Sequence, residues 1–217
     1  MESAHLGVAR GEVYLISHTV SGSSALRVAL DGTGPSSGPV TAWTLDMTGN
    51  DKGVMATAEG HPKLHGCRVN VLRSDFTLLT HVDAFTPAAD ERTGNNAPCS
   101  VVVGDVSSDF YALDQHVPRV VRLNSTGIVG AIPLPGLGAT GIGSGSGDTG
   151  DAATMRISES RGRIYTAWPS GCFSVADLTG KQLWPLSGVT PQGQLRDAYD
   201  VDPDGKVHIL AAPTKPG

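Results

Sequence analysis

The chain has 217 residues, of which 39% are hydrophobic and 17% are charged, and its formal net charge is −5. This composition is that of a globular protein, and the length is sufficient for one good-sized all-β domain. Because the charge balance is acidic and no cluster of Lys or Arg occurs along the chain, we expect no nucleic-acid partner.

The first residues, "MESAHLGVARGE", contain neither a basic leader nor a long apolar core, and no later apolar run is long enough to cross a bilayer. We therefore expect no membrane association. The three cysteines, Cys67, Cys99 and Cys172, are far apart and form no C-x-x-C pair, which is typical of reduced thiols rather than of a disulfide framework. We expect a cytoplasmic protein, with secretion as the alternative.

Short β-strands are predicted along the whole chain. No long window places apolar residues at helical spacing, and 28 glycines and 14 prolines interrupt the sequence. Segments rich in β-branched and aromatic residues lie between these turn signals. In the first half they are residues 11–17, 25–32, 40–45, 53–58, 67–72 and 76–82, and in the second half "SVVVGDV", "DFYALD", "RVVRLN", "MRIS", "RIYTAW", "FSVADL" and "KVHILAA". Many short strands of this kind are typical of an antiparallel sandwich, barrel or propeller.

A repeating cycle favours the propeller. The segments "GRIYTAW" and "FSVADLTG" match "GEVYLIS" and "LRVALDG", and they also match "DFYALD" and "RVVRLNSTG". The residues that take the same place in the cycle are Tyr14, Tyr111, Tyr165 and His208. A period of roughly 40 to 50 residues is that of a four-stranded propeller blade.

We therefore predict an all-β fold, a β-propeller of four-stranded antiparallel blades with four to five units present. A β-sandwich whose hairpins are similar to one another is the alternative. The predicted units lie at about residues 5–46, 51–83, 99–134, 153–187 and 197–217.

The segments "VDPDGKVHILAA" and "RGRIYTAW … FSVADLTGKQL" resemble the repeats of NHL-type and related six-bladed β-propellers. Blades of that family run hydrophobic-Asp-x-x-Gly-x-hydrophobic-Tyr-hydrophobic, followed by a strand that ends in Asp-x-x-Gly. The resemblance implies a ring of blades. The fifth unit stops after its second strand, so we expect an incomplete ring whose missing strands come from a partner protein or from a longer chain. The alternative is that the fifth unit is a terminal cap on a smaller, open array.

The first functional hypothesis is a non-catalytic scaffold for protein–protein interaction, without a cofactor. Loops between the second and third strands of the units share one face of a propeller, and the long connections 83–99 and 135–153 add to the contact surface. The residues that we expect on this interaction face are His18, His61, His65, His116 and Trp168.

The second hypothesis is a metal-dependent hydrolase or lyase similar to gluconolactonases. The connections that lead into the innermost strands carry Asp and Asn residues, and such loops open at the axial channel of a propeller, where oxygen ligands hold Ca²⁺ or another divalent cation. The residues that would form this site are Asp51, Asn96, Asp151 and Asp197. No sequence pattern points to a catalytic nucleophile.

A third hypothesis is a carbohydrate-binding module that presents Trp43, Trp168 or Trp184 to a sugar. Trp43 and Trp184 fall in last-strand positions, which more often pack between blades.

Overall fold

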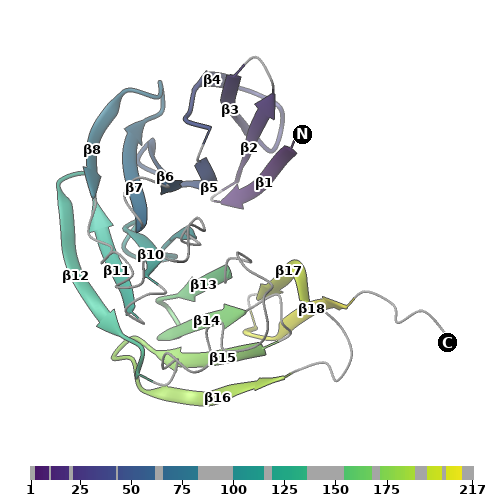
Figure 1. Ribbon diagram of the computed structural model, residues 1–217, viewed down its shortest axis with the longest axis vertical. Helices are drawn as coiled ribbons and strands as arrows, with labels where there is room; N and C mark the ends of the chain where they lie inside the picture. The colour runs from purple at the N-terminus through teal and green to yellow at the C-terminus, as the bar shows by residue number, and fades with distance from the viewer. Residues whose placement is uncertain are drawn as a thin grey trace, which may run out of the picture.

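The computed structural model describes residues 3–9, 11–19, 22–42, 44–61, 66–82, 100–114, 119–135, 154–167, 172–188, 195–201 and 204–211. These residues form four four-stranded antiparallel sheets and one two-stranded sheet. In Figure 1 the sheets follow one another around an arc, with the first strand of each sheet toward the middle and the last strand at the periphery. The arc is open between β1 and β17. Within the described ranges, no helix is long and apolar enough to span a membrane.

Each sheet is a meander of consecutive strands, which we call a blade. Blade 1 contains β1 (Ser3–Ala9), β2 (Glu12–Thr19), β3 (Gly22–Ala29) and β4 (Ser36–Pro39), and blade 2 contains β5 (Thr44–Gly49), β6 (Val54–His61), β7 (Gly66–Arg73) and β8 (Leu78–Val82). Blade 3 contains β9 (Val101–Val103), β10 (Phe110–Asp114), β11 (Arg119–Asn124) and β12 (Gly127–Pro133). Blade 4 contains β13 (Thr154–Ser158), β14 (Arg163–Ala167), β15 (Cys172–Asp177) and β16 (Gln182–Gly188), and blade 5 contains β17 (Leu195–Val201) and β18 (Val207–Ala211). The prediction of an all-β fold made of four-stranded antiparallel blades is confirmed.

The boundary between the first two blades lies earlier than the sequence indicated. We predicted residues 40–45 as the last strand of the first unit, but blade 1 closes with β4, and Thr44 begins β5 of blade 2. A turn in which the Thr44 amide donates to the Thr41 carbonyl (3.2 Å) separates the two strands. The apolar run was misleading because β4, Ser-Ser-Gly-Pro, is an outer edge strand that needs few apolar residues, whereas β5 lies innermost between neighbouring blades.

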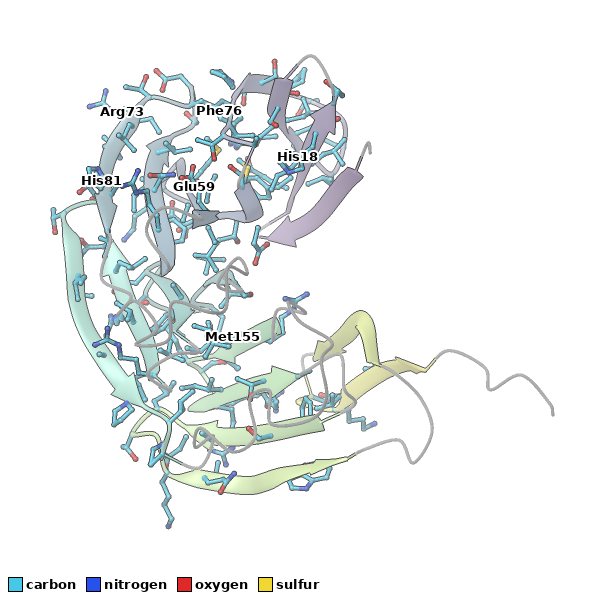
Figure 2. All side chains as sticks on the ribbon, in the orientation of Figure 1. His18, Glu59, Arg73, Phe76, His81 and Met155 are labelled. Atoms are coloured by element: carbon cyan, nitrogen blue, oxygen red, sulfur yellow. The ribbon has the colours of Figure 1, made fainter. Side chains whose placement is uncertain are left out.

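Side chains that pack between blades form the hydrophobic core. In β6, Met55 lies in one cluster with Tyr14 of blade 1, while its neighbour Ala56 lies in another cluster with Phe110 of blade 3. Successive residues of a strand point to opposite faces of the sheet, so an inner blade buries both of its faces. Met155 of β13 lies in the same way between blades 3 and 4, as labelled in Figure 2.

A residue with positive φ precedes the second strand in all five blades. It is Gly in four of them, namely Gly11, Gly53, Gly162 and Gly205, with φ between 64° and 80°. The left-handed conformation costs Gly little, and this explains the Gly that stands three residues before Tyr14, Tyr165 and His208. The predicted equivalence of these positions is therefore confirmed by the backbone.

Ser108 takes the place of this Gly in blade 3, with φ 61°. Its side chain gives a reason for the exception. The Ser108 hydroxyl donates to Asp51 Oδ1 (2.6 Å), and its carbonyl accepts from the Asn50 side-chain amide (2.9 Å), so it joins blade 3 to the β5–β6 turn of blade 2. Glycine would lack the hydroxyl contact.

The hairpin between the third and fourth strands contains the same turn in four blades. An Asp or Asn side-chain oxygen accepts a hydrogen bond from the backbone N–H of a Thr two residues later, at 2.8 to 2.9 Å. The four pairs are Asp31 with Thr33, Asp75 with Thr77, Asn124 with Thr126 and Asp177 with Thr179. Such Asx turns are favoured because the side chain supplies an acceptor for the turn backbone. Hydrogen bonds from the paired Thr lower the pKa of Asp31, Asp75 and Asp177.

We expect these turns to make the protein less stable in acid. The pKa of each of the three carboxyl groups is lower in the folded chain than in the unfolded chain, where it is about 3.9. The three ionised carboxylates therefore stabilise the folded chain fully above the unfolded-state pKa. This stabilisation is lost as the pH falls through the lower pKa values of the folded chain. Melting temperatures measured from about pH 6 down to about pH 2 should fall, and they should fall less steeply when all three residues are replaced by Asn. Asn124 shows that an amide supports the turn; an equal fall in both proteins would contradict the prediction.

Candidate functional site

The strand order gives the blades two different ends. Because neighbouring strands are antiparallel, the hairpins from first to second strand and from third to fourth strand lie at one end, here called the hairpin face. The hairpins from second to third strand and the connections between blades lie at the other end, here called the connection face. The interaction face was predicted on loops at this end, between the second and third strands.

Of the five residues predicted for the interaction face, His18 has a described side chain. It lies near the end of β2, at the connection face (Figure 2). His61 is the last residue of β6, and its side chain lies outside the described part of the structure. His65, His116 and Trp168 lie outside the described residues. Their role in an interaction face stays a prediction.

His18 joins blade 1 to blade 2. Its Nδ1 lies 2.8 Å from the Ser23 hydroxyl, and its Nε2 lies 2.9 Å from the carbonyl oxygen of Thr44. A carbonyl oxygen can only accept, so Nε2 carries a proton and donates to Thr44. The half-buried imidazole thus contacts β3 of its own blade through Nδ1 and the start of β5 through Nε2.

Two of the four residues predicted to hold a cation, Asp51 and Asp197, lie in the described part of the chain, and they belong to different blades. Asp51 lies in the β5–β6 turn at the hairpin face and not in a connection that leads into an innermost strand, as we had predicted. The reason is that β5 begins at Thr44, which places residues 50–53 after the innermost strand. Asp197 lies within β17, and Asn96 and Asp151 lie outside the described residues. In the described ranges, no group of three or more His, Cys, Asp or Glu side chains is arranged to hold a metal ion.

At the hairpin face, one carboxylate from blade 3 and one from blade 4 each accept hydrogen bonds from the hairpin of the other blade. The Glu159 carboxylate, from the β13–β14 hairpin, accepts hydrogen bonds from the backbone N–H groups of Val106 (2.8 Å) and Ser107 (2.7 Å). It also accepts from the hydroxyls of Ser107 and Tyr111, at 2.5 Å each. One carboxylate of blade 4 thus holds the β9–β10 hairpin of blade 3.

Asp105 makes the reciprocal contact from blade 3. Its carboxylate accepts hydrogen bonds from the backbone N–H groups of Glu159 (2.6 Å) and Ser160 (3.1 Å). The hydroxyls of Ser158 (3.0 Å) and Ser160 (2.5 Å) donate to its second oxygen. We call Asp105 and Glu159, with the groups that donate to them, the carboxylate clamp.

The electrostatics of the carboxylate clamp favour ionised carboxylates. Burial alone would raise the pKa of Asp105 and of Glu159, but the hydrogen bonds that they accept outweigh burial, and both pKa values are lowered. Burial and the hydrogen bond to Glu159 raise the pKa of Tyr111, which therefore stays protonated and keeps donating. Groups held in one protonation state are poor general acids or bases, so the clamp fits a structural role.

A second polar arrangement occurs in blades 1 and 3. In each blade, a Tyr of the second strand lies opposite an Arg of the third strand, and an acidic residue stands two positions before the Tyr. The residues are Glu12, Tyr14 and Arg27 in blade 1, and Asp109, Tyr111 and Arg122 in blade 3. Tyr14 donates to Glu12 (2.5 Å), and Arg27 forms a two-point ion pair with the same carboxylate. Arg122 pairs with Asp109 at 2.7 Å and lies over the Tyr111 ring, 5.9 Å from its centroid. The aligned Glu-x-Tyr and Asp-x-Tyr segments were a signal for this arrangement that the sequence analysis did not use.

Asp46 of β5 connects blade 2 with the start of blade 3. Its carboxylate accepts from the Ser100 hydroxyl (3.1 Å) and from the backbone N–H groups of Val101 (3.0 Å) and Met47 (2.9 Å). Burial raises the pKa of Asp46, although these hydrogen bonds and the charge of Arg156 act in the opposite direction. A raised carboxyl pKa is common in active sites, but here both oxygens are engaged by the chain itself.

Apolar side chains are exposed on the outer strands of blades 3 and 4. Ile128 (51% exposed) and Val129 (48%) lie on β12, and Leu183 (43%) and Trp184 (45%) lie on β16. Neither strand contains a charged residue. We call these four residues the apolar rim. The last-strand position of Trp184 had suggested a side chain enclosed between blades. Trp184 packs edge-on against Phe173, with 5.9 Å between the ring centroids, but it is 45% exposed.

The strand arrangement is similar to that of two solved structures. One is a catalytically inactive variant of virginiamycin B lyase from Staphylococcus aureus with quinupristin; the TM-score is 0.57 at 12% identity, over 98% of this chain and 71% of that protein. The other is BamB from Moraxella catarrhalis, with a TM-score of 0.52 at 12% identity, over 96% of this chain and 57% of that protein. No family model and no curated protein matches the sequence. At this identity the likeness shows the fold alone, which is a partial β-propeller.

Proposed function

We propose that this chain is a non-catalytic scaffold for protein–protein interaction and that the apolar rim binds a partner protein. The observation that carries the proposal is the exposure of Ile128, Val129, Leu183 and Trp184 on two uncharged outer strands. The cores of protein interfaces are enriched in aromatic residues and depleted in charge, and exposed apolar groups of this kind mark contact surfaces. The β15–β16 turn lies against the end of β12, where a Cβ on Gly180 would overlap the Pro133 carbonyl oxygen, so blade 3 and blade 4 are in direct contact near these strands.

The carboxylates that join neighbouring blades support the same proposal. Asp105, Glu159 and Asp46 use both carboxylate oxygens within the chain, which makes the blade junctions rigid rather than reactive. Rigid blades hold a contact surface in a fixed shape, which lowers the entropy cost of binding. We further propose that the blades are NHL-type repeats and that the protein acts in the cytoplasm without a cofactor.

Blade 5 provides a second place for a partner. In the part of the chain that is described, β18 pairs with β17 alone. The other four sheets have four strands each, and a partner protein can add a strand to a sheet through main-chain hydrogen bonds. We propose that a partner strand pairs with β18.

Charged substitutions on the apolar rim are expected to weaken partner binding. Val129→Lys and Leu183→Lys each place an ammonium group where an apolar contact is proposed, and we expect about tenfold weaker capture. The measurement is quantitative mass spectrometry of proteins that copurify with the tagged chain from cells that express it. Melting temperatures should change little, because both side chains are already exposed.

Ser37→Lys is the matched control, since Ser37 is exposed on β4, the outer strand of blade 1, and the substitution likewise adds one positive charge to an outer strand. The partner that is lost from the rim variants must be retained by this control. Equal recovery from all variants would exclude the apolar rim as the contact surface. A stoichiometric divalent ion in the purified protein, with a melting temperature that falls in EDTA and recovers in Ca²⁺, would instead favour the metal-dependent hydrolase or lyase.

A further inference from the structure

Blade 1 has one face that no other blade covers in the described part of the structure. On the face that packs against blade 2, Tyr14 and Ile16 of β2 are each 1% exposed. Val13 and Leu15 alternate with them on the opposite face, and both are only half-buried. Figure 1 shows the reason, because the arc of blades is open between β1 and β17 and blade 1 lies at its first end. We call the face that carries Val13 and Leu15 the end face.

The same positions are fully buried in the blades that follow another blade. Val13 stands two residues after Gly11, the residue with positive φ. The corresponding residues are Met55 in blade 2, Phe110 in blade 3 and Ile164 in blade 4, and none of them is more than 1% exposed. Each lies in a cluster with side chains of the preceding blade. The end face is therefore built like one side of a junction between blades.

The end face is aliphatic along both central strands of blade 1. In the register of β2 and β3, Leu26 stands opposite Leu15 and Val28 stands opposite Val13, so these four side chains share one face. Leu26 and Val28 are half-buried as well. None of the four is charged, so a second sheet placed on them would remove apolar surface from water without burying a charge.

The other end of the arc does not match the end face. In blade 5, His208 takes the place that Tyr14 has in blade 1, on the side that faces the next blade, and it is exposed. Contact between the end face and blade 5 would bring this imidazole against aliphatic side chains, which is less favourable than contact between aliphatic groups. Such head-to-tail contacts between copies would also leave an open chain. The end face therefore fits its own copy better than it fits blade 5.

The size of the end face is sufficient for a dimer. Blade 1 has four strands, and β2 and β3 have eight residues each. With strands about 4.8 Å apart and a rise of about 3.3 Å per residue, this face covers roughly 500 Å². Two copies packed face to face would bury about 1,000 Å², which reaches the lower limit for a specific interface. Two sheets packed in this way form the core of a β-sandwich.

We propose that the end faces of two copies of this chain pack together and form a two-fold symmetric dimer. In such a dimer the same patch contacts itself, so a uniformly aliphatic face is complementary to its copy. The contact buries Val13 and Leu15 as the corresponding residues of blades 2 to 4 are buried between blades. The dimer is independent of the proposed scaffold function, which rests on the apolar rim and on β18.

Sedimentation equilibrium of the full chain tests the dimer. We expect the mass to rise with concentration from that of one chain toward that of two chains. Leu15→Lys places two like charges in one interface and should weaken self-association at least about a hundredfold. Ser37→Lys should weaken it about tenfold, because Ser37 stands opposite Leu26 on β4 and adds its charge at the edge of the end face. Ser37 is exposed, so this variant removes no packed side chain and serves if Leu15→Lys fails to fold.

Leu183→Lys is the matched control. It makes the same substitution at an exposed leucine of the apolar rim, and it should leave the dimer intact. A mixing experiment separates loss of contact from loss of folding. Leu15→Glu alone should have the mass of one chain, and an equal mixture of Leu15→Glu and Leu15→Lys should regain the mass of two chains, because opposite charges then meet in the interface.

Three results would overturn the proposal. The first is a mass of one chain at all concentrations up to about 100 μM. The second is a dimer that Leu183→Lys disrupts as strongly as Leu15→Lys. The third is a different protein that copurifies with the unmodified chain and is lost from Leu15→Lys, because that protein would then cover the end face.

The dimer and the partner site on the apolar rim fail separately. Leu183→Lys should lose the partner and keep the dimer, whereas Ser37→Lys should keep the partner and weaken the dimer. Loss of the partner from Leu183→Lys therefore has no bearing on the dimer, and a chain that stays monomeric has no bearing on the apolar rim.

Discussion

Glu159→Ala is expected to lower the free energy of unfolding by about 3 kcal/mol, because it removes the acceptor of four hydrogen bonds between blades 3 and 4. Two of the donors are backbone N–H groups, and a third is the hydroxyl of Tyr111, a residue that is 2% exposed. Hydrogen bonds to a charged acceptor are worth more than neutral ones, and a buried donor left without a partner adds its own cost. Urea unfolding at neutral pH measures the loss.

Glu159→Gln keeps the shape of the side chain and removes its charge. Its amide group would turn two donor hydrogens toward groups that are themselves donors, so we expect a loss of about half that of the alanine variant. This variant keeps the prediction testable if the alanine variant fails to fold.

Asp204→Ala is the control for loss of an acidic side chain at the same face. Asp204 lies exposed in the β17–β18 turn, and we expect a change within about 0.5 kcal/mol. If Glu159→Ala cost no more than this control, the carboxylate clamp would not hold blades 3 and 4 together.

Gly180→Ala is expected to destabilise the protein by about 3 to 4 kcal/mol through two effects that add. Gly180 has φ +87°, a conformation that costs an L-residue about 1 to 2 kcal/mol. A Cβ at this position would also overlap the carbonyl oxygen of Pro133 at the end of β12, so blades 3 and 4 would have to separate. Thermal and urea unfolding should both report the loss.

Gly32→Ala separates the two effects. Gly32 lies in the corresponding hairpin of blade 1 with φ +82°, but a Cβ there would meet no atom within 4 Å. We expect its substitution to cost about 1 kcal/mol, the backbone part alone. Equal losses for the two variants would mean that contact with blade 3 does not constrain Gly180.

The repeat could be read from the sequence because it rests on local backbone chemistry. Gly11, Gly53, Gly162 and Gly205 are required wherever the first hairpin of a blade needs a positive φ, and the Asx turns require an Asp or Asn two residues before a Thr. Both signals recur at the blade period in the printed sequence. They predicted the blades correctly, although the polar strand β4 hid the boundary between the first and the second.

The contacts between blades could not be read in the same way. Glu159 and Asp105 stand in turns where acidic residues are ordinary, and nothing beside them in the sequence indicates that each accepts hydrogen bonds from the other blade. His18 was predicted for the interaction face from its place in the cycle, but its bond to Thr44 depends on a residue 26 positions away. Trp184 is likewise exposed because β16 is the outermost strand of its sheet.

By itself the sequence determined the strands, the turns between them and the four-stranded period, because hydrogen bonds and backbone conformations within a few residues specify these features. The tertiary structure alone decided which carboxylates accept hydrogen bonds from a neighbouring blade and which apolar residues face solvent. These properties depend on burial and on partners from the neighbouring blade. Such partners stand about one blade away along the chain, and only the packing of one blade on the next brings them within hydrogen-bonding distance.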